Sequence, residues 1–193
     1  MKTIDKIPTT KIQRASKMLK FGTQVGANYI KYFGEKLVSD PLIAKTRLDE
    51  ANAEDIYNGL SELKGSALKV AQMMSMDEEL LPKAFVEKFS LAQFSVPPLS
   101  APLSKKVISK ELGGDPKNKF DKINYTSSYA ASIGQVHEAW IADQKFALKV
   151  QYPGVAESIS SDLNLIKPFA LRMFNLKSAE VEDYFLEVKN KLY

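Results

Sequence analysis

Two patterns in the second half of the chain are suited to binding phosphate groups. Residues 129–132 read Tyr-Ala-Ala-Ser and lie between two segments that alternate like β-strands. A loop of small residues lets the backbone approach a phosphate and present its N–H groups. Lys149 follows in the strand-like sequence FALKVQ, where a strand would hold its ammonium group rigidly toward phosphate oxygens. The nucleotide site that we expect comprises Ala130, Ala131, Ser132 and Lys149. The alternative is an ordinary turn and a lysine whose stem covers apolar surface.

A third candidate lies on a predicted helix. Lys69 and Gln72, in the sequence Lys-Val-Ala-Gln, are three residues apart and share a helix face away from the apolar stripe. On spacing alone this pair is typical of a solvated lysine beside a polar neighbour. His137 is the only histidine, and no second ligand stands at a metal-binding spacing from it, so we interpret it as a strand residue with local hydrogen bonds. We expect no metal ligands in this chain.

The first helix that must position these groups is predicted over residues 11–38. Its apolar stripe is Ile12, Ala15, Leu19, Gly22, Gly26, Tyr29, Phe33 and Leu37. We expect this stripe to pack on the rest of the protein and the lysines to stay solvated. The alternative is a basic amphipathic helix that lies on an anionic membrane surface.

Further helices are predicted up to the glycine pair at 113–114. One should begin near Asp49 or Asn52 and run to Met76 with a buried apolar stripe. Asp77 is expected to cap the next short helix, which has Pro82 near its first turn. Another short helix is expected over residues 104–112, capped by Ser104.

The apolar period changes after residue 114. Residues 133–141 and 145–152 read as two strands joined by a turn at 142–144, and residues 120–126 are a further candidate strand. Helical periodicity then returns, with a break or kink expected near Pro168. Helices, a small antiparallel sheet and helices again predict an α+β fold.

Length and composition agree with one domain or two very small ones. The chain has 193 residues, of which 45% are apolar and 26% charged, as in ordinary globular proteins. Because there is no cysteine, a disulfide scaffold and a thiolate site are excluded and a reducing compartment is permitted. There is no secretory signal and no apolar run long enough to span a bilayer. We therefore expect a cytoplasmic protein, with peripheral membrane contact as the alternative.

Positive charge is concentrated at the N-terminus. Residues 1–47 carry ten Lys/Arg and three Asp/Glu, a net +7, so the remaining 17 bases and 20 acids sum to −3. The net charge of +4 is too small to predict nucleic-acid binding. We divide the chain into a basic helical arm (1–47), a helical extension (48–114) and a sheet followed by helices (115–193).

Three segments, taken together, carry a resemblance to a known family. They are ALKVAQMMS, AASIGQVHEAW and FALKVQYPGVAESISSDL, and they occur in this order with QFSVPPLS between the first two. In sequence and order the chain resembles the UbiB/AarF family of atypical protein-kinase-like proteins over about residues 55–193.

The resemblance implies a kinase-like fold with an added helical N-terminal extension. It also implies an alanine-rich loop in place of a glycine-rich one, here Ala130, Ala131 and Ser132, and a nucleotide lysine, here Lys149. Lys69 and Gln72 match the ends of a Lys-x-Gly-Gln motif that folds over the site. The implied cofactors are ATP or ADP and, in the complete protein, Mg²⁺. Many members support quinone lipid biosynthesis at membranes.

The chain departs from the family pattern at two positions and lacks several motifs. Ala71 replaces the motif glycine, and Tyr129 occupies the position of the first alanine of the loop. No catalytic-loop or DFG-type sequence occurs, so we interpret the chain as the N-terminal nucleotide lobe of such a protein, either a truncated product or an engineered fragment. We do not expect it to be catalytic alone. The alternative is a regulatory or membrane- and partner-binding module that keeps the fold without ATP chemistry.

Overall fold

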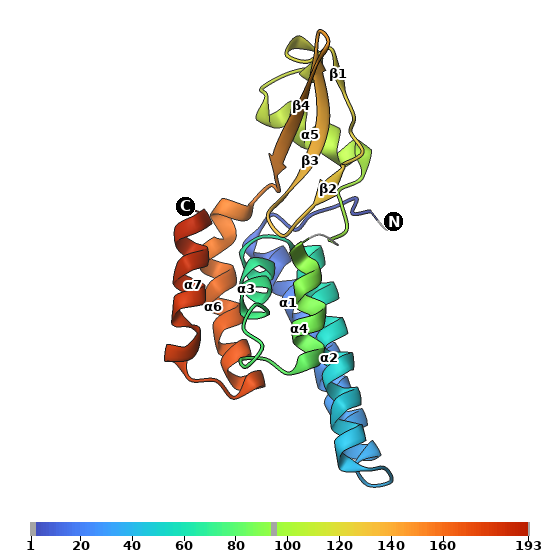
Figure 1. Cartoon of the computed structure of the whole chain (residues 1–193), viewed down its shortest axis with the longest axis vertical. Coiled ribbons are helices and arrows are strands. Elements are labelled where there is room, and N and C mark those ends of the chain that lie inside the picture. Colours follow the sequence, from blue (N-terminus) through green and yellow to red (C-terminus); the bar gives the residue numbers. More distant parts are fainter. Residues whose placement is uncertain (1–2, 94–95, 193) are drawn as a thin grey trace.

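A computed structural model describes residues 3–93 and 96–192 of the chain (Figure 1). The helices are α1 (Lys11–Glu35), α2 (Pro41–Leu63), α3 (Ser66–Met74), α4 (Lys83–Ser90), α5 (Ala101–Glu111), α6 (Val155–Phe174) and α7 (Ser178–Leu192), with 3-10 turns at Leu91–Gln93 and Pro116–Asn118. The strands are β1 (Lys122–Ile123), β2 (Tyr129–Ala130), β3 (Gly134–Ile141) and β4 (Gln144–Gln151). The α+β prediction is confirmed.

The sheet is built around one antiparallel hairpin. β3 and β4 pair along their whole length, from Gly134 opposite Gln151 to Ile141 opposite Gln144. The turn between them contains Ala142 at a φ of 48°, close to the predicted position. β1 and β2 both pair with the other side of β3, which leaves β4 at the edge of the sheet among the described residues. The predicted strand over 120–126 is reduced to the two residues of β1.

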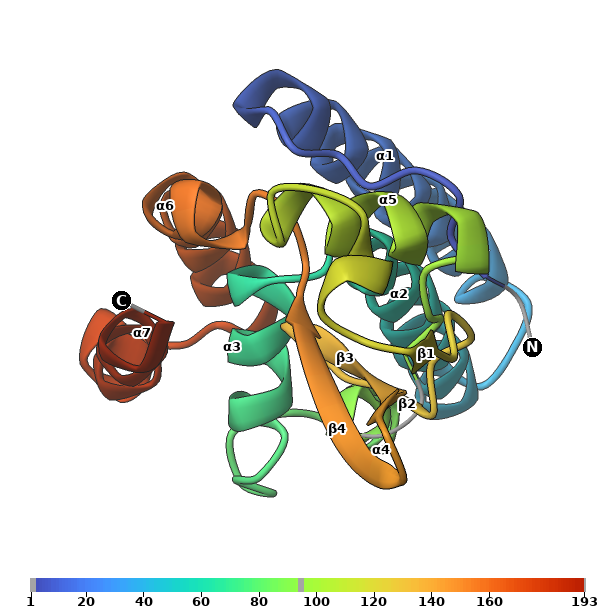
Figure 2. The ribbon, with the colours of Figure 1, turned by 90° about the horizontal axis from the view of Figure 1, so that it is seen from above.

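One face of the sheet is covered and the other is open. Figure 2 shows α5 lying along one face of the sheet, where Leu148 and Val150 of β4 join the apolar residues of that helix in a small core. Gln135 anchors this contact because its amide donates to Ser104 Oγ at 2.9 Å and accepts from the backbone N–H of Leu99. Ser104 therefore lies inside α5, which begins at Ala101, and its predicted role as a cap is wrong.

The helix predicted from residue 49 to 76 is two helices. α2 begins earlier, at Pro41, because Asp40 caps it by accepting from the N–H groups of Leu42 and Ile43. It ends at Lys64 and Gly65, whose φ values of 59° and 80° cannot continue a right-handed helix. α3 restarts at Ser66 in a new direction, so a backbone reversal precedes the Lys-Val-Ala-Gln motif.

Two other predicted helix boundaries are wrong. Asp77 accepts from the N–H of Glu79 in a turn, and α4 starts only after Pro82. α6 continues through Pro168, so a break does not occur there, and the helix ends at Phe174 before the left-handed Asn175. Phe85 of α4 faces the core and is 1% exposed.

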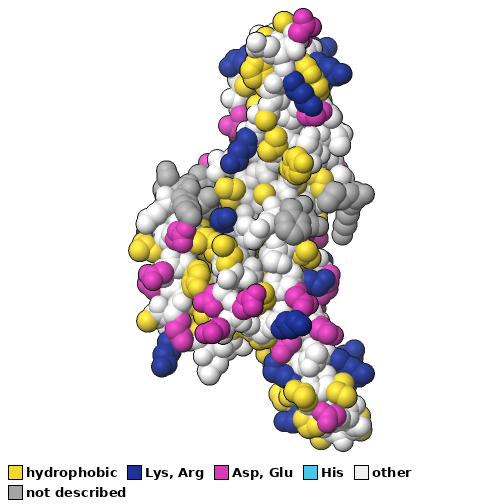
Figure 3. Space-filling view, viewed as in Figure 1, with side chains coloured by type: hydrophobic (Ala, Val, Ile, Leu, Met, Phe, Trp, Pro, Cys, Tyr) yellow, Lys and Arg dark blue, Asp and Glu magenta, His cyan; other side chains and the backbone are white. Residues whose placement is uncertain are grey.

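Ile12, Leu19, Phe33 and Leu37 of the apolar stripe predicted for α1 are exposed, so their predicted burial is wrong, and only Tyr29 among its large side chains packs against the core. The side that packs on α2 carries Phe21 and Val25 instead. The ring of Phe21 lies so close to the backbone of Gly59 that a Cβ on this glycine would be 2.4 Å from it, so α1 and α2 approach closely at this contact. Figure 3 shows hydrophobic and basic side chains exposed together at the free end of the α1–α2 hairpin.

Candidate functional site

Lys149 lies on the open face of the sheet. The strand register puts Tyr129, Val136 and Lys149 in one row across β2, β3 and β4, so their side chains share a face. Ala147, two residues before Lys149, lies on the same face. Lys149 and Tyr129 are both exposed. Around Lys149 the open face thus presents an ammonium group, a small and an apolar neighbour, and the aromatic Tyr129 at one border.

The next row turns toward α5 and explains why Lys149 points outward. Ala130, Gln135 and Val150 form this row and are all buried. His137 follows on β3 and is fully buried, with Nδ1 2.9 Å from the carbonyl oxygen of Asn124 and Nε2 2.8 Å from Gln135 Nε2. Burial lowers the pKa of His137. Its interpretation as a strand residue with local hydrogen bonds is confirmed.

The predicted motif on α3 contacts the loop that follows β2. Gln72 Oε1 accepts a hydrogen bond from Lys69 Nζ at 3.1 Å and another from Ser132 Oγ at 3.2 Å. The carbonyl of Ser132 accepts from the N–H of Gly65 at 2.7 Å, just before α3 begins. The structure therefore brings Lys69, Gln72 and Ser132 together, although they are up to 63 residues apart in the sequence.

A cavity of about 400 Å³ runs along the edge of β4 beside Lys149. It lies between β4, the end of α5 and the start of α6, and its walls include Glu111 and Glu157. Lys149 is thus a lining residue of the same cavity as two acidic residues.

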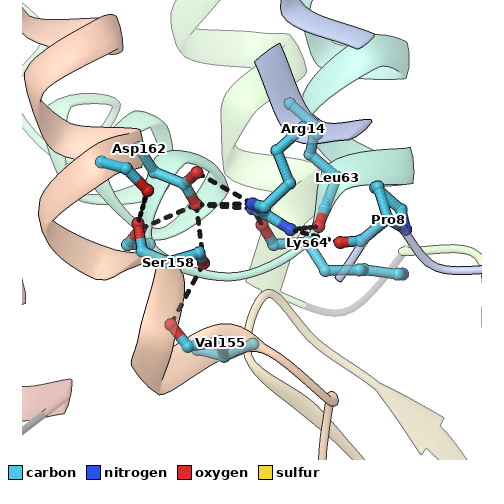
Figure 4. Close-up of polar contacts among 9 residues, drawn as sticks. Pro8, Arg14, Leu63, Lys64, Val155, Ser158 and Asp162 are labelled. Carbon is cyan, nitrogen blue, oxygen red and sulfur yellow. Dashed lines mark hydrogen bonds and ion pairs between the residues drawn. The ribbon is translucent and has the colours of Figure 1, made fainter. Parts of the chain in front are cut away.

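Arg14 and Asp162 form a buried ion pair that the sequence analysis did not predict. Both side chains are 1% exposed, and Arg14 Nη2 lies 2.5 Å from Asp162 Oδ2 (Figure 4). The remaining Arg14 donors bind the carbonyls of Pro8, Leu63 and Lys64, as Figure 4 also shows.

The same carboxylate also holds the motif helix. Asp162 Oδ2 accepts from Ser66 Oγ in the first turn of α3 and from Ser158 Oγ in α6. The ion pair therefore joins α1, the α2–α3 junction and α6 at one point. Asp162 lies within FALKVQYPGVAESISSDL, the third segment that resembles the family, and this is the only feature of the sequence that points to it. No sequence pattern points to Arg14.

Lys64 is a second buried cation that the sequence did not reveal. It is fully buried, its Nζ donates to the carbonyl oxygen of Pro97 at 2.5 Å, and the same atom lies 4.9 Å from the centre of the Tyr152 ring. Burial lowers the pKa of Lys64 to about 7. Lys64 thus links the end of α2 to the segment before α5 and to the residue that follows β4.

Comparison with known proteins gives the family. The model of the ABC1 atypical kinase-like domain matches residues 91–193, more than half of the chain. The chain belongs to the ABC1 atypical kinase-like family. The resemblance to the UbiB/AarF proteins is thereby confirmed, and the matched region contains the alanine loop and Lys149.

The curated relatives are much longer than this chain. "Atypical kinase COQ8, mitochondrial" of Saccharomyces cerevisiae is 38% identical over 162 residues, which cover 82% of this chain and 32% of that protein. "Probable serine/threonine-protein kinase abkA" of Dictyostelium discoideum is 32% identical over 196 residues, covering 97% of this chain and 34% of that protein. The chain therefore spans about a third of the length of these relatives.

A solved structure titled "The complex structure of Rv3197-erythromycin from Mycobacterium tuberculosis" is 30% identical, with a TM-score of 0.35, and the match covers 77% of this chain and 40% of that one. Within residues 3–93 and 96–192, no helix is both long and apolar enough to cross a bilayer.

Proposed function

We propose that this chain is the nucleotide-binding lobe of a UbiB-type atypical kinase or ATPase and that it is not catalytic alone. The observation that carries the proposal is the placement of Lys149. Its side chain lies on the open face of the sheet, in one row with Tyr129 and Val136 of the β2–β3 hairpin. The alanine loop (Ala130, Ala131 and Ser132) belongs to this hairpin, and Gln72 on the motif helix accepts a hydrogen bond from Ser132. The division into an arm, an extension and a sheet region stays a prediction.

ATP or ADP fits the residues of this face. The ammonium group of Lys149 would bind phosphate oxygens as a point charge, and Ala147 and Val136 would leave room for the nucleotide against the sheet. Gln72 would hold the loop by accepting from Ser132, and Lys69 lies within reach of the same amide oxygen. When bound, the nucleotide would supply the phosphoryl group.

Magnesium is implied by the family, but no ligand set for it is found within the described residues. In that part of the chain, no group of three or more His, Asp or Glu side chains is arranged to hold a metal ion. We therefore assign Mg²⁺ to no residue here. The role in quinone lipid biosynthesis at membranes is proposed from the family resemblance, and a cytoplasmic location stays a prediction from the sequence.

The second candidate is a module that retains the fold without nucleotide chemistry. Tyr129 favours it, because a large exposed aromatic residue borders the face on which the phosphates would lie. The two functions differ in one measurable property. A ligand that binds only the folded state raises the melting temperature by mass action, and the second candidate predicts no such effect.

The test is a thermal shift of the 193-residue chain with ADP or ATP. We expect a rise in melting temperature that increases with nucleotide concentration and is lost in Lys149→Ala. The matched control is Lys145→Ala, which removes a lysine from the same strand and the same face. No shift at any concentration, or an equal shift in Lys149→Ala, would exclude the nucleotide-lobe proposal.

A further inference from the structure

Two adjoining hollows lie where the N-terminal segment passes the start of α1. The first, of about 460 Å³, is bounded by that segment, α1, α2 and Pro97. The second, of about 560 Å³, lies between the same segment and the first turns of α1. Lys6 and Lys17 line both, so the hollows meet at these two side chains. We call the two together the arm groove; their size is that of sites for small organic molecules.

The wall that the N-terminal segment contributes is held in place. The N–H of Ile4 donates to the carbonyl of Pro98 at 2.8 Å, and the carbonyl of Ile4 accepts from the N–H of Ser100 at 2.9 Å. Ile7 is 6% exposed and belongs to the small core beneath the sheet. In Figure 1 this blue segment crosses between the sheet and the helices. Lys6 is therefore exposed on a segment that is anchored on both sides of it.

The first turns of α1 present hydrogen-bond donors to the second hollow. Gln13 closes a capping box, in which its Oε1 accepts from the N–H of Thr9 and its own N–H donates to Thr10 Oγ1, each at 3.2 Å. Because the amide oxygen is engaged there, the NH2 group of Gln13 remains as a donor. Ser16 lies one turn further along the helix and also lines this hollow. The second hollow thus combines an amide, a hydroxyl and ammonium groups.

Positive charge exceeds negative charge in the arm groove. Its ionisable lining residues are Lys6, Lys17, Lys20 and one acid, Glu62, so its net charge is +2. Lys17 is paired with Glu62, whereas no carboxylate of the described residues lies within ion-pair distance of Lys6 or Lys20. A compact dianion is the complementary ligand. A phosphate monoester fits, because it carries about −1.5 to −2 charges at pH 7 and several acceptor oxygens.

The first hollow suits a polar body attached to that phosphate. Tyr57 and Ser61 of α2 line it and are 7% and 2% exposed, and Asn58 stands at its rim. Asn58 Nδ2 donates to Glu54 Oε1, so the amide oxygen remains as an acceptor. An apolar body would remove such groups from water without replacing their hydrogen bonds, whereas hydroxyl groups could replace them.

We propose that the arm groove binds a soluble phosphate monoester of a small polyol, such as a sugar phosphate. The phosphate would lie in the second hollow against Lys6, Lys20 and Gln13, and the hydroxylated body would enter the first hollow beside Asn58. A lipid phosphodiester is the less favourable ligand, because it has a single negative charge and an apolar body. The proposal does not rest on nucleotide binding, since no residue of the sheet lines either hollow.

The first test is isothermal titration of the 193-residue chain with glucose 6-phosphate, inorganic phosphate and glucose. We expect glucose 6-phosphate to bind more tightly than phosphate, and glucose not to bind. Lys6→Gln/Lys20→Gln should weaken binding of glucose 6-phosphate roughly tenfold or more, because hydrogen bonds to charged groups are lost. The matched control is Lys31→Gln/Lys36→Gln, which removes the same charge from the far half of α1 and should bind like wild type.

A steric pair tests the location of the site. Ser16→Phe places a large side chain in the second hollow and should abolish binding. Ala15→Phe adds a similar volume at the neighbouring position, which lines neither hollow, and should leave binding unchanged. All six substituted positions are exposed, so circular dichroism and melting temperature should stay as in wild type.

Four results would overturn the proposal. They are no binding of glucose 6-phosphate up to about 10 mM, affinity for it no greater than for inorganic phosphate, equal weakening in the two lysine pairs, and displacement of it by phosphatidylglycerol vesicles. Lys149→Ala should bind glucose 6-phosphate like wild type. Loss of binding in this variant, with Lys6→Gln/Lys20→Gln unaffected, would place the anion on the sheet face and overturn the arm groove while leaving the nucleotide proposal intact.

Discussion

Arg14 and Asp162, 148 residues apart in the sequence, meet in a buried pair in which Arg14 Nε lies 2.8 Å from Asp162 Oδ1. Arg14 also donates to the last carbonyls before α3, and Asp162 accepts from Ser66 in its first turn. The start of the motif helix is therefore fixed by two elements that flank it on opposite sides.

Removal of one partner of this pair should be strongly destabilising. Asp162→Asn or Arg14→Met leaves an uncompensated buried charge or unpaired buried groups, and we expect a loss of about 3–5 kcal/mol in the free energy of unfolding. Denaturant unfolding at neutral pH measures it. The control is Lys45→Met, which removes an exposed pair with Asp49 and should cost less than about 1 kcal/mol. Equal losses in the two cases would contradict the role given to Arg14.

Lys64 should give the protein a pH-dependent stability. Its pKa is about 7 in the folded chain and 10.5 for an exposed lysine, so the unfolded chain binds more protons between these values. The contribution of Lys64 to the free energy of unfolding therefore rises as the pH increases from about 7 to about 10.5 and is constant below about 7.

Unfolding of wild type and Lys64→Met across pH 6 to pH 9 measures this contribution. The difference between them should shift in favour of wild type by a few kcal/mol as the pH rises. Lys106→Met, at an exposed position, should differ from wild type by a constant amount. A pH-independent difference for Lys64→Met would show that the ammonium group stays charged in the folded protein.

Gln72 and Ser132 should act as a unit on the alanine loop. Gln72→Ala removes the acceptor for Ser132 Oγ and should cost about 1 kcal/mol, with faster hydrogen exchange at the Gly65 N–H that binds Ser132. Ser132→Ala should have a similar effect, and the double variant should be little worse than either. Gln24→Ala, on the exposed side of α1, serves as the control; strictly additive effects would rule out the coupling.

Replacing Tyr129 with the smaller family residue should open the nucleotide face. Tyr129→Ala is expected to raise the affinity for ADP roughly three- to tenfold, because the aromatic side chain shares a row with Lys149. Isothermal titration measures the affinity. The melting temperature without nucleotide should hardly change, since the side chain is 73% exposed. Phe33→Ala, an exposed aromatic on α1, should leave affinity unchanged, and lower affinity in Tyr129→Ala would mean that the ring stacks on the nucleotide.

Short-range sequence patterns predicted the parts of the fold that depend on local geometry. The β3–β4 hairpin was predictable because Phe146, Leu148 and Val150 alternate with polar or small residues and because a short turn precedes them. The row that aligns Lys149 with the β2–β3 hairpin follows from this register. The break at Lys64 and Gly65 was not predictable from periodicity, since the apolar pattern continues across it while the backbone does not.

The side of α1 that packs inward depends on its partner and not on its own composition. The predicted stripe has the larger apolar content, but Gly59 on α2 lets Phe21 pack closely on the other side, and Arg14 needs Asp162 and the end of α2. The spacing of apolar residues within α1 predicts neither the contact of Phe21 with Gly59 nor the partners of Arg14. The buried hydrogen bonds of Arg14 and Lys64 could not be predicted from local patterns either, because their acceptors lie far away in the sequence.

The position of β4 has a consequence for solubility. Among the described residues β4 pairs on one side only, so its other edge presents unpaired backbone groups that can recruit a strand from a neighbouring molecule. Lys145 and Lys149 stand along this edge, and charged side chains of this kind oppose edge-to-edge association. Lys149 would thus oppose edge-to-edge association of the free chain in addition to the nucleotide role proposed for it, and its replacement by an uncharged residue would remove both properties at once.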